Sequence, residues 1–158
     1  RQFSMDRDIG TAAEFSAWPR KDDAPLADRP DSGRAIKIKF STPAFAVTYR
    51  YGRAANRYVR WLGTAPHRTA DGAELAASTV VVQHVNAVVT DDVGRREVST
   101  QRGGAAEVYA DGRAQVGRWQ VREGRTQWLS GDGAPLALNA GPTWVEVVDA
   151  TAVIEVAQ

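Results

Sequence analysis

The stretch that decides the fold is Ala35-Ile36-Lys37-Ile38-Lys39-Phe40, in which apolar and basic residues alternate one by one. Successive side chains of a β-strand point to opposite faces, so this alternation predicts a strand with one buried and one exposed face. The same period of two continues through Phe45, Val47, Tyr49 and Tyr51. We therefore expect a β-domain that begins at about residue 34.

Turn chemistry separates the later apolar runs. Asp-Gly pairs at 71–72, 111–112 and 132–133 favour tight hairpin turns, because Asp and Gly tolerate positive φ. The run from Thr79 to Val85 is rich in β-branched residues and apolar on both faces, which is typical of a central strand. The other candidate strands are 58–62, 88–90, 97–101, 105–109, 116–121, 126–129, 136–138, 143–148 and 152–156.

This series of short strands predicts an all-β fold, a mainly antiparallel sandwich or partly open barrel. The best helix candidate is Asp71–Ala77, which is two turns at most. The first 33 residues differ, since Pro19, Pro25 and Pro30 lie among mixed charges. Proline disfavours helices and central strands, so we expect residues 1–33 to be an extended arm, a linker or the remnant of a preceding domain, and residues 34–158 to be the β-domain.

The composition excludes several classes of protein. The chain has 158 residues, of which 43% are hydrophobic and 25% charged, as in ordinary globular domains. The formal net charge of +1 gives no overall field to attract nucleic acid, and there is no apolar run long enough for a transmembrane helix. Because there is no cysteine, disulfides, thiolate nucleophiles and cysteine metal sites are excluded. The chain starts at Arg1 without an initiator Met or leader, so we expect a mature product or a fragment.

Catalytic and cofactor motifs are absent from the sequence. There is no P-loop, no Gly-x-Gly-x-x-Gly, no His-Glu-x-x-His and no Gly-x-Ser-x-Gly. The two histidines, His67 and His84, lie seventeen residues apart, and a zinc site would need carboxylates beside them. We therefore predict no metal, no cofactor and no catalytic residue, with His84 as a strand residue that faces a neighbour or water.

One stretch is locally basic and aromatic. Residues 41–70 contain no Asp or Glu but hold five arginines, with tyrosines and a tryptophan between them. Guanidinium groups bind anions in a bidentate manner, and aromatic faces stack on sugars or bases, so this stretch can form a binding surface. The candidate binding residues are Arg57, Tyr58, Arg60, His67 and Arg68. The alternative is that strand alternation buries the aromatics and leaves the arginines on a solvated face. A fully buried, carboxylate-paired Arg60 would favour that alternative.

The tryptophans divide into two groups. Trp119, Trp128 and Trp144 fall within candidate strands, where large rings usually fill the core. Trp18 and Trp61 are the better candidates for contact with another domain.

Several short motifs in order resemble a known family. They are Val80-Val81-Val82-Gln83, Val108-Tyr109-Ala110-Asp111-Gly112, Gly117-Arg118-Trp119 and Leu138-Asn139-Ala140-Gly141-Pro142-Thr143-Trp144. Residues 34–158 thereby resemble the C-terminal domain of the YerB-like lipoproteins, a bacterial family of unknown function. The resemblance implies a secreted, lipid-anchored envelope protein with a larger N-terminal domain before this one. It supplies no catalytic residues.

These observations favour a non-catalytic binding or interaction domain of an extracytoplasmic envelope protein. Its expected partners are its own N-terminal domain, an anionic cell-wall polymer or another envelope protein, with no nucleic acid and no membrane contact except through a lipid anchor outside this chain. One alternative is half of an envelope hydrolase, in which Tyr58, Arg60 and His67 complete a site with the missing domain. The other is a structural support domain, with Phe15 and Trp18 marking a docking face.

Overall fold

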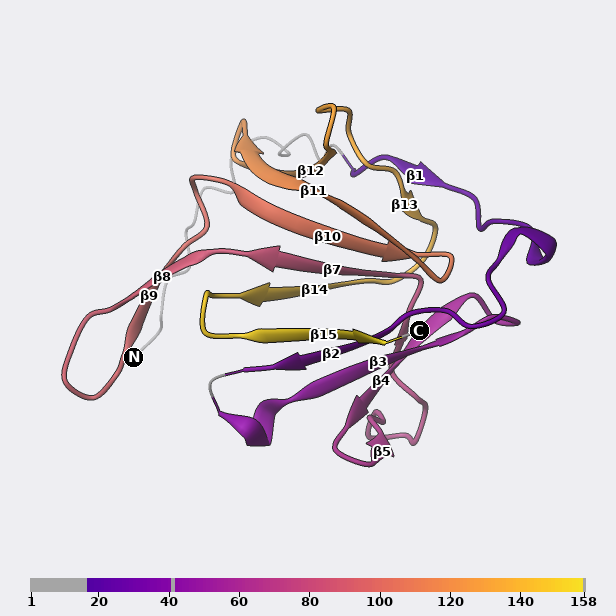
Figure 1. The fold of residues 1–158 in the computed structure, drawn as a ribbon, viewed down its shortest axis with the longest axis horizontal. Helices are drawn as coiled ribbons and strands as arrows, with labels where there is room; N and C mark the ends of the chain where they lie inside the picture. Colours follow the sequence, from indigo (N-terminus) through magenta and orange to yellow (C-terminus); the bar gives the residue numbers. More distant parts are fainter. Residues whose placement is uncertain (1–16, 41, 158) are drawn as a thin grey trace, which may run out of the picture.

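The structure, a computed structural model, describes residues 17–40 and 42–157. The described strands form two main β-sheets of a sandwich, which lie next to each other in the view of Figure 1. The first sheet has five strands in the order β12-β11-β10-β7-β14. Their bounds are β12 Arg125–Ser130, β11 Arg113–Arg122, β10 Gly104–Ala110, β7 Thr79–His84 and β14 Thr143–Val148. Neighbours are antiparallel except for β14 and β7, which run parallel.

The second sheet has six strands and is antiparallel throughout. Its order is β15-β2-β3-β4-β5, and β6 also pairs with β4. The strands are β15 Val153–Ala157, β2 Ala35–Lys39, β3 Val47–Gly52, β4 Arg57–Leu62, β5 Ala65–Pro66 and β6 Ala76–Ala77. The sheets do not close into a barrel, so the all-β prediction is confirmed in its sandwich form.

The core lies between the two sheets and follows from the alternation in the sequence. Ile36 and Ile38 of β2 point inward and pack with Tyr49, Val80 and Val82. The opposite face of the five-stranded sheet carries a second apolar cluster of Val81, Val85, Ala106, Val108, Trp119, Trp128, Leu136 and Leu138. Strand β7 is therefore buried on both faces, as its continuous apolar run predicted.

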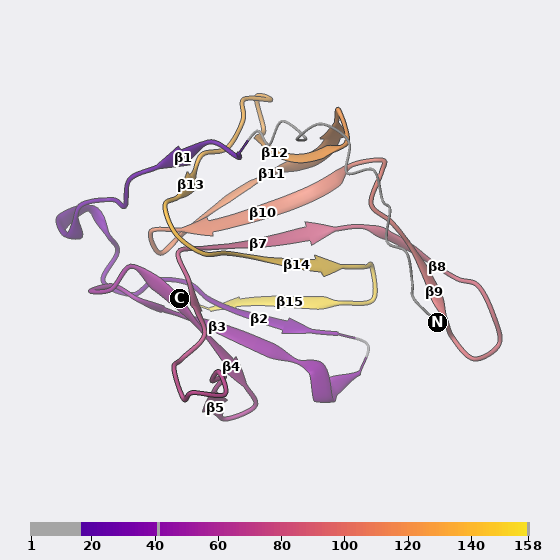
Figure 2. The same cartoon turned by 180° about the vertical axis from the view of Figure 1, so that it is seen from behind.

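Residues 17–33 lie along one end of the five-stranded sheet (Figure 2). Strand β1, Arg20–Lys21, pairs in parallel with β13, Leu138–Asn139. A 3₁₀ turn, η1, follows at Leu26–Asp28. Prolines disfavour a central strand, and accordingly β1 is a two-residue strand in a two-stranded sheet.

Two local predictions were wrong. The helix expected at Asp71–Ala77 is a reverse turn followed by β6, because Gly72 has φ +90° and Arg68 bridges Glu74. The strand expected from Phe45 begins at Val47, since residues 43–45 form a second 3₁₀ turn, η2 Pro43–Phe45. No helix in the described part of the chain is long and apolar enough to cross a membrane. Phe15 lies outside the described residues.

A hairpin projects from the sandwich (Figures 1 and 2). It consists of β8, Asn86–Val89, and β9, Arg96–Ser99, which among the described residues form a separate two-stranded sheet. Its exposed apolar side chains are Val88, Val89, Val93 and Val98. The hairpin is tied to the sandwich near its turn, where Arg96, which lies opposite Val89, pairs with Asp149 and donates to the hydroxyl of Thr151.

Candidate functional site

The five candidate binding residues do not form one surface. Tyr58 is fully buried between the sheets, with its ring centroid 5.1 Å from that of Tyr51. Arg57 lies at the end of the sandwich, where it contacts Asp23 at 3.4 Å. Arg68 is exposed in the loop between β5 and β6 and pairs with Glu74 at 2.7 Å.

Arg60 and His67 do lie together, and both are half-buried. The Arg60 side chain is only 14% exposed, and its Nη1 is 2.5 Å from Nδ1 of His67. Its Nε lies 3.8 Å from Oε1 of Glu146, and its guanidinium lies over the ring of Trp144. Among the described residues, the His67 ring is therefore within hydrogen-bond distance of the Arg60 guanidinium, rather than of a carboxylate or a hydroxyl. Arg60 lies near a carboxylate and its side chain is largely but not fully buried, which counts in part against an open patch at this position.

Glu146 is the centre of this interior cluster. The Tyr49 hydroxyl donates a 2.5 Å hydrogen bond to Glu146 Oε1, and both side chains are buried. Burial, together with the adjacent Glu146 carboxylate, raises the pKa of Tyr49 far above its usual value, so the phenol stays protonated as a donor. Because Tyr49 is on β3, Arg60 on β4 and Glu146 on β14, the cluster joins the two sheets.

The open part of the basic, aromatic stretch is the outward face of the six-stranded sheet. Arg50 is exposed, and its guanidinium lies 3.8 Å from the centroid of the Trp61 ring. The strand register adds Lys37, opposite Thr48, and Lys39 next along β2. We call Lys37, Lys39, Arg50 and Trp61 the outer basic face.

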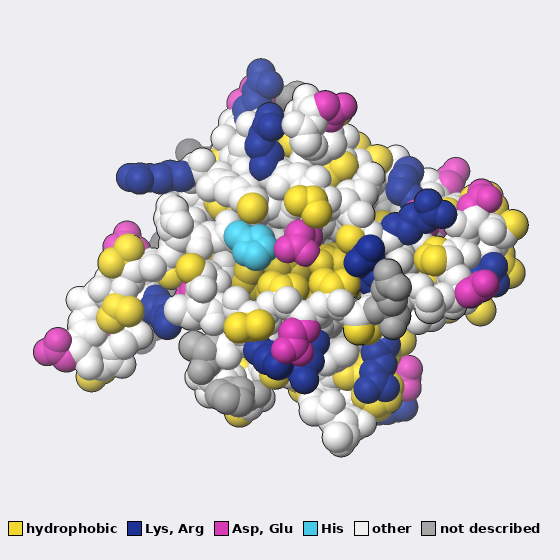
Figure 3. Space-filling model, viewed as in Figure 1, with side chains coloured by type: hydrophobic (Ala, Val, Ile, Leu, Met, Phe, Trp, Pro, Cys, Tyr) yellow, Lys and Arg dark blue, Asp and Glu magenta, His cyan; other side chains and the backbone are white. Residues whose placement is uncertain are grey.

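Charge on the outer basic face is predominantly positive. Glu155 of β15 pairs with Lys39 and lies 3.9 Å from Lys37. Basic side chains surround an acidic one over β15 and β2 in the space-filling view (Figure 3). Three cations and one anion therefore lie on this face, and Arg50 has its stacking partner in Trp61.

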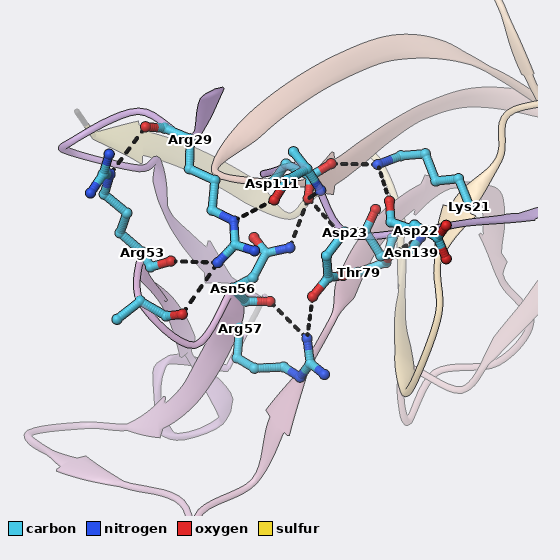
Figure 4. Close-up of polar contacts among 12 residues, drawn as sticks. Lys21, Asp22, Asp23, Arg29, Arg53, Asn56, Arg57, Thr79, Asp111 and Asn139 are labelled. Carbon is cyan, nitrogen blue, oxygen red and sulfur yellow. Dashed lines mark hydrogen bonds and ion pairs between the residues drawn. The ribbon is translucent and has the colours of Figure 1, made fainter. Parts of the chain in front are cut away.

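A second polar centre surrounds Asp111 (Figure 4). Its Oδ1 accepts hydrogen bonds from Nδ2 of Asn56 and of Asn139, both at 2.7 Å, and from the Ala24 N–H at 3.1 Å. Its Oδ2 pairs with Lys21. Burial alone would raise the pKa of Asp111, but these donors together hold it well below its usual range.

The Asp111 centre fastens the arm to the domain, because two of its donors, Lys21 and Ala24, belong to residues 17–33. Sequence reasoning assigned Asp111 only to a hairpin turn. That assignment is confirmed, since Asp111 and Gly112 have φ of +52° and +73°. Its buried partners come from segments far apart in sequence, so the sequence carried no signal for them.

Comparisons with known proteins identify the family of this chain. Residues 36–145 match the family described as "Protein of unknown function (DUF3048) C-terminal domain". The chain belongs to this family. A comparison with curated proteins gives no match.

A solved structure similar to this DUF3048 domain is the YerB protein from Bacillus subtilis. The TM-score is 0.73 at 20% sequence identity, and the match covers 87% of this chain and 46% of that one. This similarity shows the fold, and the domain spans about half of the length of its neighbour. The resemblance to the YerB-like C-terminal domain is thereby confirmed.

The DUF3048 domain has a further cluster of polar side chains, which lie on β7 and β10. Nε2 of His84 lies 3.2 Å from Glu107 Oε1, while the Tyr109 hydroxyl donates to the other oxygen of Glu107. The indole N–H of Trp119 donates to the His84 carbonyl at 2.7 Å and fixes the strand end. His84 therefore faces a neighbour, as predicted for a strand residue.

Proposed function

We propose that this domain is a non-catalytic binding domain of a secreted, lipid-anchored bacterial envelope protein, and that its outer basic face binds an anionic cell-wall polymer. The observation that carries the proposal is the exposed Arg50 guanidinium stacked on Trp61, beside Lys37 and Lys39. A guanidinium stacked through its face keeps its N–H donors at the edge, where they can bind a phosphate or carboxylate in a bidentate manner.

The spacing of the charges suits a polymer better than a single small anion. Lys37 is on β2 and Trp61 is on β4, so two strand spacings of about 4.8 Å separate them. The face therefore extends over roughly 10 Å and can contact more than one anionic group along a chain. An indole beside these cations adds a surface on which a sugar ring can stack.

The compartment and the anchor rest on the resemblance to YerB-like lipoproteins. The chain spans 46% of the YerB structure, and we propose the remaining part of such a protein as a second partner. The β8–β9 hairpin favours this second function of docking to another domain, because its exposed valines project from the sandwich. A two-stranded hairpin is marginally stable by itself, so an additional contact would stabilise it.

The test is binding of the purified domain to isolated cell-wall material across a salt series. The variant Arg50→Ala removes the stacked guanidinium, and Lys37→Ala tests the neighbouring strand. Arg68→Ala is the matched control, since it removes an exposed arginine that pairs with Glu74 outside this face. Arg57 and Arg60 are poor choices, because both make internal contacts.

We expect binding that weakens as salt increases, and that falls in Arg50→Ala and Lys37→Ala but not in Arg68→Ala. Salt-independent binding, or an equal loss in all three variants, would contradict the proposal.

A further inference from the structure

A cavity of about 450 Å³ lies between residues 17–19 and strand β12. Its lining includes Trp18, Trp128, Thr126, Gln127, Leu136 and one charged residue, Arg125. The volume is within the range of pockets that hold small ligands. The cavity borders the five-stranded sheet, whereas the outer basic face belongs to the six-stranded sheet, so the two sites are separate.

Two indole rings form the main wall of this cavity. Trp18 and Trp128 have centroids 4.5 Å apart and planes tilted by 49°. Trp128 is 3% exposed and belongs to the second apolar core, whereas Trp18 is 36% exposed. Trp18 is therefore the accessible ring, and Trp128 supports it from behind.

Both rings are fixed by their own hydrogen bonds. The Trp18 indole N–H donates to the Thr126 carbonyl at 2.8 Å, and that of Trp128 donates to Gln83 Oε1 at 3.2 Å. The chain beside Trp18 is held too, since the Leu138 N–H donates to the Pro19 carbonyl at 2.9 Å. With their donors engaged, the indoles offer ring faces to a ligand, and binding would cost little ordering of the protein.

Polar side chains share the cavity with these rings. Thr126 and Gln127 line it. Thr126 is on the same face of β12 as Trp128, whereas Gln127 is on the opposite face, where its Oε1 accepts a 3.1 Å hydrogen bond from Gln120. The Thr126 hydroxyl can both donate and accept a hydrogen bond. Flat apolar rings beside a hydroxyl match a ligand that has an apolar face and hydroxyl groups on its edge.

A pyranose ring has that combination, because its axial C–H groups form an apolar face and its equatorial hydroxyls surround it. We propose that the Trp18–Trp128 cavity binds a neutral sugar ring of an oligosaccharide, with the ring stacked on Trp18 and a hydroxyl bonded at Thr126. This inference does not depend on the proposed function. The two sites predict different ligands, an uncharged sugar here and a polyanion on the outer basic face.

The test is a titration of the domain with two neutral trisaccharides, chitotriose and maltotriose, followed by the NMR signals of its five tryptophan indole N–H groups. We expect at least one trisaccharide to shift the Trp18 and Trp128 signals and leave the Trp61 signal in place. Neutral ligands should bind equally at low and high salt. Arg50→Ala should leave this binding unchanged, which separates it from cell-wall binding.

Two variants at Trp18 and one control complete the test. Trp18→Ala should raise the Kd at least tenfold, whereas Trp18→Phe, which keeps a flat ring, should retain part of the affinity. Trp61→Ala should change the Kd less than twofold. Thermal unfolding of each variant checks that the fold is intact.

The proposal is overturned if neither trisaccharide shifts the Trp18 and Trp128 signals in the millimolar range. It is also overturned if Trp18→Ala binds as the wild type does. A proline-rich peptide that shifts the two signals when the sugars do not would identify the cavity as a peptide site instead. Loss of cell-wall binding in Arg50→Ala bears only on the outer basic face.

Discussion

Replacing Asp111 should be among the most damaging single changes in the domain. Asp111→Ala removes the acceptor for the side-chain amides of Asn56 and Asn139, which are 1% and 0% exposed. A buried polar group left without a partner costs about 1–3 kcal/mol, so the two amides together cost about 2–6 kcal/mol. A non-glycine residue at φ +52° that cannot bond locally adds about 1 kcal/mol. Because whole domains are stable by only about 5–15 kcal/mol, this variant should be severely destabilised or fail to fold.

Asp111→Asn is the measurable version of this change. Asn tolerates the positive φ and keeps an oxygen for the two amides and the Ala24 N–H, but it loses the charge that pairs with Lys21. Losing a charge-assisted hydrogen bond of this kind costs about 1.5–3 kcal/mol. Equilibrium unfolding in urea should therefore show a midpoint lowered by roughly 1 M, at the usual slope for a small domain.

The pH dependence gives an independent check of the cause. The pKa of Asp111 is lower in the folded state than in the unfolded chain, so its stabilising contribution is complete above the unfolded pKa of about 3.9. The contribution decreases as the pH falls through the folded pKa. The difference in unfolding free energy between wild type and Asp111→Asn should thus be constant near neutral pH and shrink below about pH 4.

Asp132→Asn is the matched control, since it changes another Asp that precedes a Gly in a turn. Asp132 contacts Ser130 at an exposed site, so its substitution should leave the urea midpoint nearly unchanged. The reasoning is refuted if Asp111→Asn unfolds at the wild-type urea concentration, if the difference does not vary with acid pH, or if the control loses as much stability.

Three further outcomes follow from single contacts. Tyr49→Phe removes the donor to buried Glu146 and should lower the free energy of unfolding by about 1.5–3 kcal/mol, measured in urea, with little change as the contradictory result. Gly117→Ala would place a Cβ 2.0 Å from the Leu129 carbonyl oxygen, so it should displace β11 from β12 and lower the melting temperature by at least several degrees. An unchanged melting temperature would refute that contact. Arg96→Ala should speed hydrogen exchange in the β8–β9 hairpin without changing exchange in β7, and uniform effects would show that the hairpin is not held by this contact.

The strands were predictable because their alternation is strong. Ile36 and Ile38 alternate with lysines, and the structure buries the isoleucines and exposes Lys37. The run in β7 has no alternation, and it is buried on both faces for that reason. The parallel pairing of β14 with β7 was not predictable, because strand order depends on contacts between segments far apart in the chain.

The candidate site was harder to predict than the fold. Residue type identified Arg60 and Arg68 equally, but alternation turns Arg60 inward beside Glu146 and leaves Arg68 in an exposed loop. Arg50 and Trp61 belong to the same basic, aromatic stretch. Their stacking depends on how β3 and β4 align with each other, and this register could not be predicted from the sequence. Composition therefore identifies the segment that holds the exposed Arg50 and Trp61, but not which of its side chains lie together on the surface.

The location of the buried charges indicates which parts of the domain serve stability and which remain for binding. Glu146 joins the two sheets through Tyr49 and Arg60, and Asp111 joins the arm to the domain through Lys21 and Ala24. Buried charges of this kind are costly unless paired, so these groups are committed to holding elements together. Arg50 on the outer basic face and Trp18 at the Trp18–Trp128 cavity are exposed and pair with no buried charge, so their replacement should have little effect on the fold. A variant that loses ligand binding but keeps its unfolding midpoint should therefore come from these two surfaces, and that separation makes both proposals testable in the isolated domain.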